Sequence, residues 1–411
     1  MPKYKTLDDF NVKNKTVLVR VDFNSEIDPD TKKVTSDVRI RAHAESTLKE
    51  LAEKGAKTVI LAHQGRKGDP DYTTLEAHTQ VLKKILKTVP VEYIDDIFGD
   101  KAKAGIKKLK AGEILVLENV RGWDGETKSG TPEAQSKTVL VQNLAPLADL
   151  FVSDAFSAAH RSHVSMVGFT AVLPSAAGRI MQRELTSLSK ALEKPDHPCV
   201  YVMGGAKADD SLEISKYVLS NGIADYVLVG GVTSQLFLAA KGIDLGKPTM
   251  DYLAHKELTQ FIPGIKALID QFPEKVKTPL DLAINIYGDR SEITLADLPT
   301  QYSIFDLGHK TIESYAKIIK GAKSIVVSGP MGVYENPQFN YGTKGVLTAI
   351  ADSKAFSLAG GGNTIAAIEE YGLTKKVSYI STAGGALIEF LMGKKLPGVV
   401  ALEKAVNTKK V

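Results

Sequence analysis

The chain has 411 residues, of which 43% are hydrophobic and 24% are charged, and its net charge is only +4. This length predicts two domains, and the absence of a basic block argues against a nucleic-acid partner. The single cysteine, Cys199, excludes a disulfide within the chain. Because no apolar run reaches the ~20 residues that span a bilayer and the first residues lack a signal-peptide core, we expect a soluble, cytoplasmic protein without a membrane partner.

Short β-branched runs alternate with amphipathic stretches along the first half of the chain. The stretches 37–54 and 74–88 are typical of helices. The strands that we expect in this half cover residues 16–23, 58–63, 91–94, 113–119 and 150–156. Continuous Val/Ile/Leu runs of this kind are typical of strands that are covered on both faces.

The second half repeats the pattern. The expected strands carry the sequences CVYVMGG, DYVLVGG, LDLAINIYG, YSIFDLG, SIVVSGP, FSLAGGG and VSYISTAGG. Alternating strands and helices predict parallel sheets with right-handed crossovers. We therefore expect an α/β protein with two doubly wound, mostly parallel, Rossmann-like domains, joined by a long helix and a hinge.

The best junction between the two domains is the stretch 176–198. It has the leucine spacing of a long helix, which Pro195 and Pro198 would end. We therefore expect domains at 1–175 and 196–391, with an interdomain helix at 176–195.

Charged and hydrogen-bonding side chains follow the strands of the first half. They include Asp22 and Asn24, His63 and Arg66, Arg121, and the group His160, Arg161 and His163, while Arg39 starts a helix. Ligands of open α/β sheets bind at the carboxyl ends of the strands, and arginine suits carboxylate and phosphate. The pattern predicts a small ligand with more than one negative group. His160 and His163 have no evident third ligand nearby, so we do not expect a metal there.

Glycine turns follow the strands of the second half instead. They lie at 204–207, 230–234, 328–332, 359–364 and 382–386. Glycine lets backbone N–H groups approach a ligand closely, and helix N-termini favour anions. Five such turns at one sheet edge predict a nucleotide, while the G-x-G-x-x-G fingerprint of dehydrogenases is absent. A small anion held by one domain and phosphates held by the other would suit phosphoryl transfer with hinge closure.

The motifs VRVDFN, DAFSAAHRSH, SGPMGVYE and STAGGA occur in this order along nearly the full chain. With them the sequence resembles the phosphoglycerate kinase family, and AHQGRKGDPDYTTLEAH and VEYIDDIFG resemble its archaeal branch. The resemblance implies a reversible transfer between 1,3-bisphosphoglycerate with MgADP and 3-phosphoglycerate with MgATP, in glycolysis and gluconeogenesis. It also implies that segment 392–411 packs on the N-terminal domain. We expect a monomer, with a homodimer as the open alternative.

The resemblance also implies roles for individual residues. The residues that would bind the glycerate substrate are Asp22, Asn24, Arg39, His63, Arg66, Arg121 and Arg161. Those that would bind the nucleotide are Gly204, Gly205, Lys207, Gly230, Pro330, Glu335, Gly361, Gly362, Asn363 and Thr364. Arg39, Lys207, Gly361 and Gly384 would stabilise the transferring phosphoryl group.

Five positions depart from the bacterial and eukaryotic pattern of the family; two of them are Lys67, where that pattern has proline, and Val232, where it has a third glycine. Ser211 stands where that pattern has a second lysine, Ser328 where it has asparagine, and Asn363 where it has an aspartate that contacts Mg²⁺. Asn363 still offers an oxygen, and Mg²⁺ in such sites is held mainly by phosphates and water. The departures keep open a second hypothesis, a catalytically weak homologue that binds nucleotide or phosphoglycerate; an oxidoreductase is disfavoured by the missing fingerprint.

Overall fold

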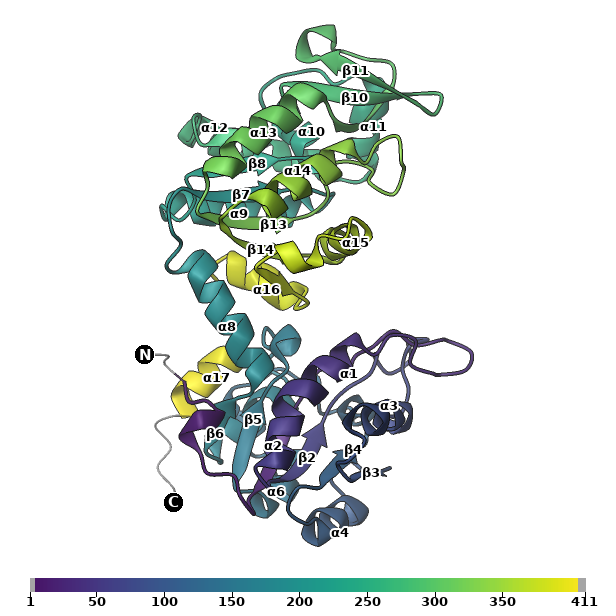
Figure 1. Cartoon of the computed structure of the whole chain (residues 1–411), viewed down its shortest axis with the longest axis vertical. Coiled ribbons are helices and arrows are strands. Elements are labelled where there is room, and N and C mark those ends of the chain that lie inside the picture. The colour runs from purple at the N-terminus through teal and green to yellow at the C-terminus, as the bar shows by residue number, and fades with distance from the viewer. Residues whose placement is uncertain (1–3, 406–411) are drawn as a thin grey trace. The chain divides into compact units, whose positions relative to one another are not determined.

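The computed structural model describes residues 4–405 of the chain (Figure 1). The chain forms two compact units, one of Met1–Leu185 together with Lys395–Val411 and one of Thr186–Lys394. Each unit is built on its own six-stranded parallel sheet, so the expected α/β fold is confirmed. None of the helices in the described part of the chain has the length and hydropathy of a bilayer-spanning segment.

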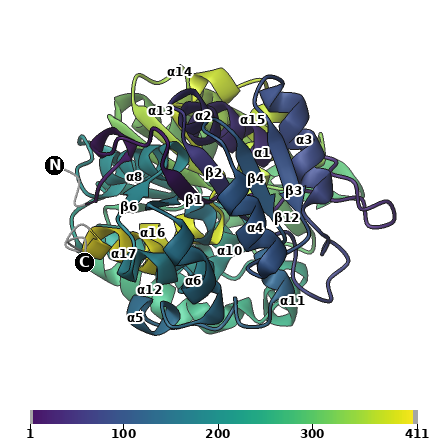
Figure 2. The same ribbon diagram turned by 90° about the horizontal axis from the view of Figure 1, so that it is seen from below.

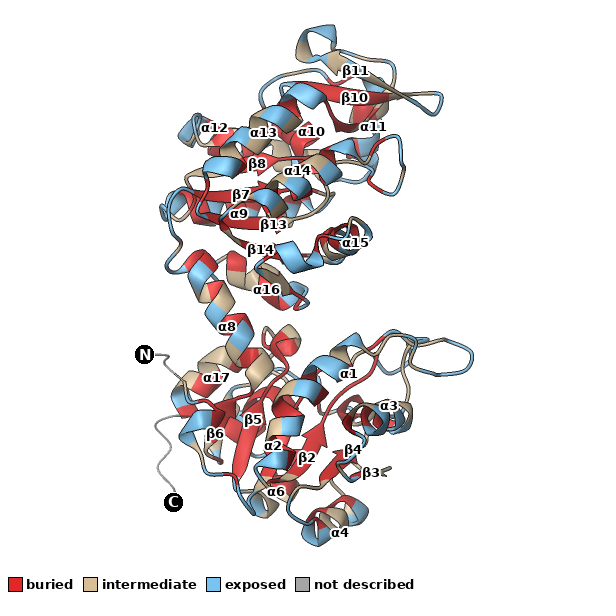
Figure 3. Ribbon diagram, in the orientation of Figure 1, coloured by how far each residue is buried: buried red, intermediate tan, exposed pale blue. Residues whose placement is uncertain are grey.

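The sheet of the first unit has the strand order β3-β4-β2-β1-β5-β6, and all its pairs are parallel. Its strands are β1 (Thr16–Arg20), β2 (Lys57–Leu61), β3 (Val91–Ile94), β4 (Ile114–Leu117), β5 (Leu150–Ser153) and β6 (Ser175–Ala177). Alternate residues of β1 face opposite sides: Val17 and Val19 belong to one apolar cluster and Leu18 to another. Both faces of β1 are therefore buried, and Figure 3 shows buried residues along β2, β4, β5 and β6 as well.

Helices cover both faces of this sheet. The α-helices are α1 (Val38–His43), α2 (Lys49–Glu53), α3 (Glu76–Leu86), α4 (Asp100–Lys108), α5 (Pro132–Gln135), α6 (Val139–Leu144), α7 (Val164–Val167) and α17 (Pro397–Ala405). Short 3₁₀ segments are η1 (Leu7–Asp9), η3 (Val120–Gly122), η4 (Ala145–Leu147), η5 (Phe156–Ala158) and η6 (Gly168–Ala171). Figure 2 shows α1, α2 and α3 on one side of the strands and α4 and α6 on the other.

Two expectations for this unit, a helix at 37–54 and the packing of the C-terminal segment, can be compared with these helices. The helix expected at 37–54 is α1 followed by α2, with the π-helical segment η2 (Ala44–Leu48) between them. The last helix, α17, packs against α7 and η6 of the first unit. The N–H of Gly398 in α17 donates to the carbonyl of Ala159 at 2.8 Å. Of the segment expected to pack there, 392–411, the helix α17 thus belongs to the first unit, residues 392–394 are grouped with the second, and 406–411 lie outside the described residues.

The second unit has a sheet of the order β15-β14-β13-β7-β8-β9, again entirely parallel. Its strands are β7 (Cys199–Met203), β8 (Tyr226–Val229), β9 (Val276–Lys277), β13 (Ser324–Ser328), β14 (Phe356–Gly360) and β15 (Tyr379–Ser381). Its α-helices are α9 (Ala208–Ser220), α10 (Gly231–Ala240), α11 (Lys247–His255), α12 (Ile262–Gln271), α13 (His309–Gly321), α14 (Tyr341–Asp352), α15 (Gly362–Glu370) and α16 (Gly385–Leu391). Its 3₁₀ segments are η7 (Leu258–Phe261), η8 (Leu295–Asp297) and η9 (Thr374–Lys376).

Two expected strands of the second half lie outside the parallel sheet. The strands β10 (Asp281–Ile286) and β12 (Ser303–Leu307) form a separate antiparallel sheet with β11 (Asp289–Thr294). The reason is the two-residue turn Tyr287-Gly288, in which both residues have positive φ, 53° and 106°. Such turns join antiparallel strands, whereas parallel strands need a long crossover.

The helix expected at 176–195 is α8 (Arg179–Leu192). It starts later because Ala176 and Ala177 pair with β5 as the edge strand β6. The carboxylate of Asp154 then accepts hydrogen bonds from the backbone N–H groups of Ile180 and Met181, at 2.9 and 3.2 Å. A carboxylate at this place satisfies free N–H groups of the first helical turn.

The turns that follow β7 and β13 touch through their backbones. The N–H groups of Gly204 and Gly205 donate to the carbonyls of Ser328 and Pro330, both at 2.8 Å. Gly329 has a φ of +88°, and a Cβ there would overlap the carbonyl group of Gly204. Only glycine satisfies both the backbone angle and the close approach.

We therefore predict that Gly329→Ala lowers the free energy of unfolding by roughly 2–4 kcal/mol. Alanine is strained at a positive φ, and its Cβ would also overlap the backbone of Gly204. Urea unfolding followed by circular dichroism measures the change. The matched control is Gly321→Ala at the end of α13, where an added Cβ meets no atom within 4 Å. A Gly329→Ala variant as stable as this control would contradict the prediction.

Candidate active site

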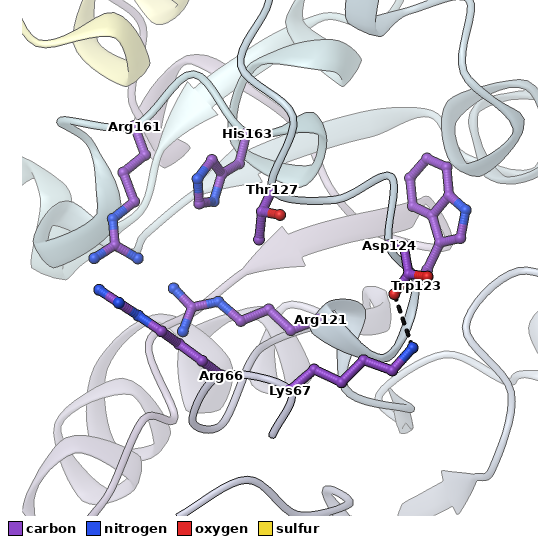
Figure 4. A pocket seen from close by; sticks show the side chains of 8 residues that line it. All are labelled: Arg66, Lys67, Arg121, Trp123, Asp124, Thr127, Arg161 and His163. Carbon is purple, nitrogen blue, oxygen red and sulfur yellow. Dashed lines mark hydrogen bonds and ion pairs between the residues drawn. The ribbon is translucent and has the colours of Figure 1, made fainter. Parts of the chain in front are cut away.

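A cavity of about 520 Å³ in the first unit is rich in positive charge (Figure 4). Its lining residues are Arg66, Lys67, Arg121, Trp123, Asp124, Thr127, Arg161 and His163. Arg66 follows β2, Arg121 lies in η3 after β4, and Arg161 follows η5 after β5. The carboxyl ends of three parallel strands thus bring these arginines together, and Figure 4 shows their guanidinium groups turned toward one another.

The three arginines have no carboxylate partner within 4.0 Å among residues 4–405, whereas their neighbour Lys67 pairs with Asp124 at 2.8 Å. Burial, and then the charges of Arg161 and Arg20, lower the pKa of Arg121 to about 10. Burial and the charge of Arg66 likewise lower the pKa of Arg161. The cations therefore repel one another, and an anion bound among them would relieve this repulsion.

Asp22 organises the polar groups next to this cavity. Its carboxylate forms an ion pair with Arg39 and accepts hydrogen bonds from the hydroxyl of Ser157 at 2.6 Å and the N–H of Asn24 at 3.0 Å. Burial alone would raise the pKa of Asp22, but the charge of Arg39 and the other partners hold it below its usual range. Arg39, about one-third exposed, is thereby held in place by a buried charge.

Hydrogen bonds through His43 also connect the backbone of Asp22 to Asp154. The backbone N–H of Asp22 donates to Nε2 of His43 at 3.1 Å, and Nδ1 of His43 lies 2.7 Å from the carboxylate of Asp154. Nε2 is therefore the acceptor and Nδ1 carries the proton. Because Asp154 also binds the start of α8, the same carboxylate anchors both the site and that helix.

The other two expected residues of this unit, Asn24 and His63, are both engaged. The side-chain oxygen of Asn24 accepts from the N–H of Gly65 at 2.8 Å. Nδ1 of His63 lies 2.9 Å from Nη2 of Arg20. Burial, and then Arg20, lower the pKa of His63 well below its usual value, so its ring is neutral and accepts from the arginine.

Arg20 was not expected as part of the site. It is only 2% exposed, and its Nε donates to the hydroxyl of Ser165 at 2.8 Å. That hydroxyl in turn donates to the buried carboxylate of Glu126 at 2.6 Å. The signal in the sequence was an arginine inside the apolar run TVLVRVDF, because a fully buried arginine requires partners.

A cavity of about 480 Å³ in the second unit collects the glycine turns. The expected residues among its lining are Gly204, Gly205, Lys207, Pro330, Gly361, Gly362, Asn363, Thr364 and Gly384. They follow β7, β13, β14 and β15, and α9 and α15 begin at the same edge. Free backbone N–H groups at helix starts and glycine turns are suited to phosphate.

A second cavity of about 270 Å³ adjoins this one and shares Gly205, Ala206, Pro330 and Asn363 with it. Its wall also includes the apolar side chains of Ile304, Phe305 and Val333. Two exposed side chains, Glu335 and Tyr252, also line it. A polar cavity that continues into an apolar one fits a nucleotide, whose phosphates and base have these properties.

Two expected residues have structural tasks. Gly230 lines neither cavity, because it is buried against Met331 so closely that a Cβ would overlap the sulfur; its neighbour Gly231 borders the cavity instead. The hydroxyl of Thr364 accepts from the N–H of Gly329 at 2.7 Å, so it holds the neighbouring turn. A sequence motif alone does not show whether a glycine borders the cavity or packs against a neighbouring element behind it.

The comparison with known families decides the family. The model of the phosphoglycerate kinase family matches residues 7–394. The chain belongs to the phosphoglycerate kinase family. The phosphoglycerate kinase of Methanothermobacter thermautotrophicus is 47% identical over 403 residues, covering 98% of this chain and 97% of the relative. The phosphoglycerate kinase of Pyrococcus furiosus is 44% identical over 401 residues, covering 97% of both chains.

Solved structures agree with this. The crystal structure of phosphoglycerate kinase from Pyrococcus horikoshii covers 99% of this chain and all of its own, with a TM-score of 0.88 and 43% identity. The structure from Coxiella burnetii covers 98% of this chain and 99% of its own, with a TM-score of 0.85 and 32% identity. The expected family and the likeness to its archaeal members are confirmed.

Within residues 4–405 no three His, Cys, Asp or Glu side chains are grouped as metal ligands. The amide of Asn363 lines both cavities of the second unit. One amide oxygen suits Mg²⁺ that arrives already bound to nucleotide phosphates, because Mg²⁺ keeps several water and phosphate ligands. The residues present therefore fit a magnesium–nucleotide complex.

The cationic cavity gives a pH prediction for His163. Burial, and then Arg161 and Arg121, lower its pKa in the folded chain to about 4. As the pH falls below about 6.5 the unfolded chain binds a proton that the folded chain does not, so His163 lowers stability increasingly toward acid pH. Relative to His163→Gln, we predict that the wild type loses about 1 kcal/mol of unfolding free energy between pH 7 and 5, since solvent partly screens the incompletely buried ring.

Urea unfolding of both proteins at the two pH values measures this difference. An NMR titration of the His163 ring checks its cause and is expected to show a neutral imidazole at pH 5. A ring that titrates near its ordinary value would contradict the assignment.

Proposed function

We propose that the chain catalyses the reversible phosphoryl transfer between MgATP with 3-phosphoglycerate and MgADP with 1,3-bisphosphoglycerate, a step of glycolysis and gluconeogenesis. The observation that carries the proposal is the convergence of Arg66, Arg121 and Arg161, without carboxylate partners, on one cavity of a phosphoglycerate kinase family member. The glycine-lined cavity of the second unit supports the nucleotide part of the proposal.

In this proposal the first unit binds the phosphoglycerate. Arg66, Arg121 and Arg161 hold its phosphate, because planar guanidinium groups donate paired hydrogen bonds to phosphate oxygens. Asp22, Asn24 and His63 orient the glycerate part, and Arg39 lies at the carboxylate end. The hydrogen bonds that fix Asp22, Asn24 and His63 support this role, because they leave these groups little freedom to reorient.

The second unit binds the magnesium–nucleotide complex. Residues 361–364 offer backbone N–H groups to the phosphates, and Lys207 adds a positive charge. Gly204 and Gly205, whose own N–H groups are bonded to Ser328 and Pro330, line the cavity and let the phosphates approach the backbone closely. Asn363 offers an oxygen toward the magnesium ion, and Glu335 accepts a hydrogen bond from the ribose. Support comes from the two adjoining cavities, one lined by glycine turns and the other mostly apolar.

The transfer is a single in-line step. A carboxylate oxygen of 3-phosphoglycerate forms a bond to the γ-phosphorus of ATP while the bond from this phosphorus to the β–γ bridging oxygen breaks, and ADP leaves with that oxygen's electron pair. The carboxylate is already ionised near neutral pH, so no general base is required. Arg39, Lys207 and the N–H groups of Gly361 and Gly384 stabilise the charge on the transferring group. Direct transfer requires that the two substrates meet, which we attribute to a hinge.

We predict that Arg39→Ala and Lys207→Ala each lower kcat by about 10²–10³, because each removes one charge from the transition state. The assay couples 1,3-bisphosphoglycerate formation to NADH oxidation through glyceraldehyde-3-phosphate dehydrogenase. The control is Arg41→Ala on the same helix as Arg39; Arg41 is exposed and paired with Asp37 and Glu45. Its activity is expected to match that of the wild type.

Wild-type turnover that is no higher than that of these two variants would contradict the proposal. If MgATP and 3-phosphoglycerate then still bind, the chain is a ligand-binding homologue rather than a kinase. Equal losses in Arg41→Ala and Arg39→Ala would show that the loss comes from disturbing α1.

A further inference from the structure

The phosphate cavity of the second unit has one lysine at its glycine turn. Lys207 is the N-cap residue of α9 and is exposed. Ser211, one turn later, is only 3% exposed, and its hydroxyl lies 3.4 Å from the hydroxyl of Thr233. Ser211 is therefore a buried neutral group, and α9 contributes a single positive side chain to this cavity.

A second lysine lines the same cavity from another element. The ionisable side chains in the lining are Lys207, Lys394, Asp210 and Glu389. Without Lys394, two carboxylates would face one lysine, and the side chains would repel a polyphosphate. With Lys394 the two positive and two negative side chains cancel in net charge. The backbone N–H groups and the magnesium ion then make the electrostatic potential in the cavity positive.

The position of Lys394 is fixed by the packing of α16 against α9. Gly393 has a φ of +74°, and a Cβ there would overlap the ring of Tyr217 on α9. The N–H of Lys394 donates to the carbonyl of Glu389 at 3.0 Å, which closes the end of α16. This close approach, which only glycine permits, brings the next residue beside α9.

Electrostatics agree with this placement. Burial and the charge of Asp209 raise the pKa of Asp210, whereas Lys207 and Lys394 act in the opposite direction. Both lysines therefore lie close enough to Asp210 to stabilise its charge. Neither has a carboxylate within 4.0 Å among residues 4–405, in contrast to the surface pair of Lys376 and Asp352 at 3.1 Å. The ammonium group of Lys394 is thus not committed to an ion pair within this part of the chain.

We propose that Lys394 is a nucleotide-binding residue that supplies the second positive charge of the phosphate cavity, in place of a lysine on α9. The inference rests on the proposed function, because it takes the polyphosphate of a magnesium–nucleotide complex as the ligand. It assigns the two cations of the cavity to different elements, one at the start of α9 and one beyond the end of α16.

Calorimetric titration of the full chain with MgADP and with adenosine tests this role. Lys394→Met keeps most of the side chain and removes the charge, and it is expected to raise the Kd of MgADP about tenfold, the effect of one charged contact. Adenosine, which has no phosphate, is expected to bind equally well to both proteins. Lys394→Arg keeps the charge and is expected to restore most of the MgADP affinity.

Lys395→Met is the matched control, because this exposed lysine is the next residue but lines no part of the cavity. It is expected to bind MgADP like the wild type. Unchanged MgADP binding by Lys394→Met, or an equal loss of adenosine binding, would overturn the proposed role of Lys394 but not the proposed function of the chain. A wild-type chain that binds no MgADP would instead overturn the proposed function.

Discussion

Parallel strand pairing is the constraint on which the rest of the structure depends. It directs the carboxyl ends of all strands in a sheet to one edge, so that whatever follows each strand gathers there. In the first unit arginines follow β2, β4 and β5, and in the second unit glycine turns follow β7, β13 and β14. One architecture thus yields a site made of side chains in one unit and a site made mainly of backbone in the other.

The two sites solve different electrostatic problems. The first unit holds several cations close together, and Asp22 fixes Arg39 while Arg66, Arg121 and Arg161 keep their charges free for an anion. The second unit relies on backbone N–H groups at its edge, and the turns at Gly204 and Gly329, which touch through their backbones, shape that edge. An exchange of a phosphoryl group between two anionic substrates needs both kinds of site, because catalysis depends on positioning and on charge stabilisation.

Much of this was predictable from sequence, because apolar runs locate buried strands and their last residues locate the sheet edge. Most strands of both parallel sheets followed from that pattern, as did the convergence of the arginines, whereas the short strands β6 and β9 were not predicted. The antiparallel hairpin at Tyr287 was missed, because its second strand, β11, carries polar residues with no strand signal. Gly230 was expected at the nucleotide, but it packs against Met331 and its neighbour Gly231 borders the cavity. Arg20 was not found, because its contact with His63 joins distant parts of the chain.

Calorimetric titration of an Arg66→Ala/Arg161→Ala double variant tests whether the two substrates bind to separate units. The variant removes two cations from the first unit and leaves the second unit unchanged. We predict that 3-phosphoglycerate affinity falls at least about a hundredfold while MgADP affinity stays within about twofold of the wild type. Retained 3-phosphoglycerate binding, or a parallel loss of MgADP binding, would contradict it.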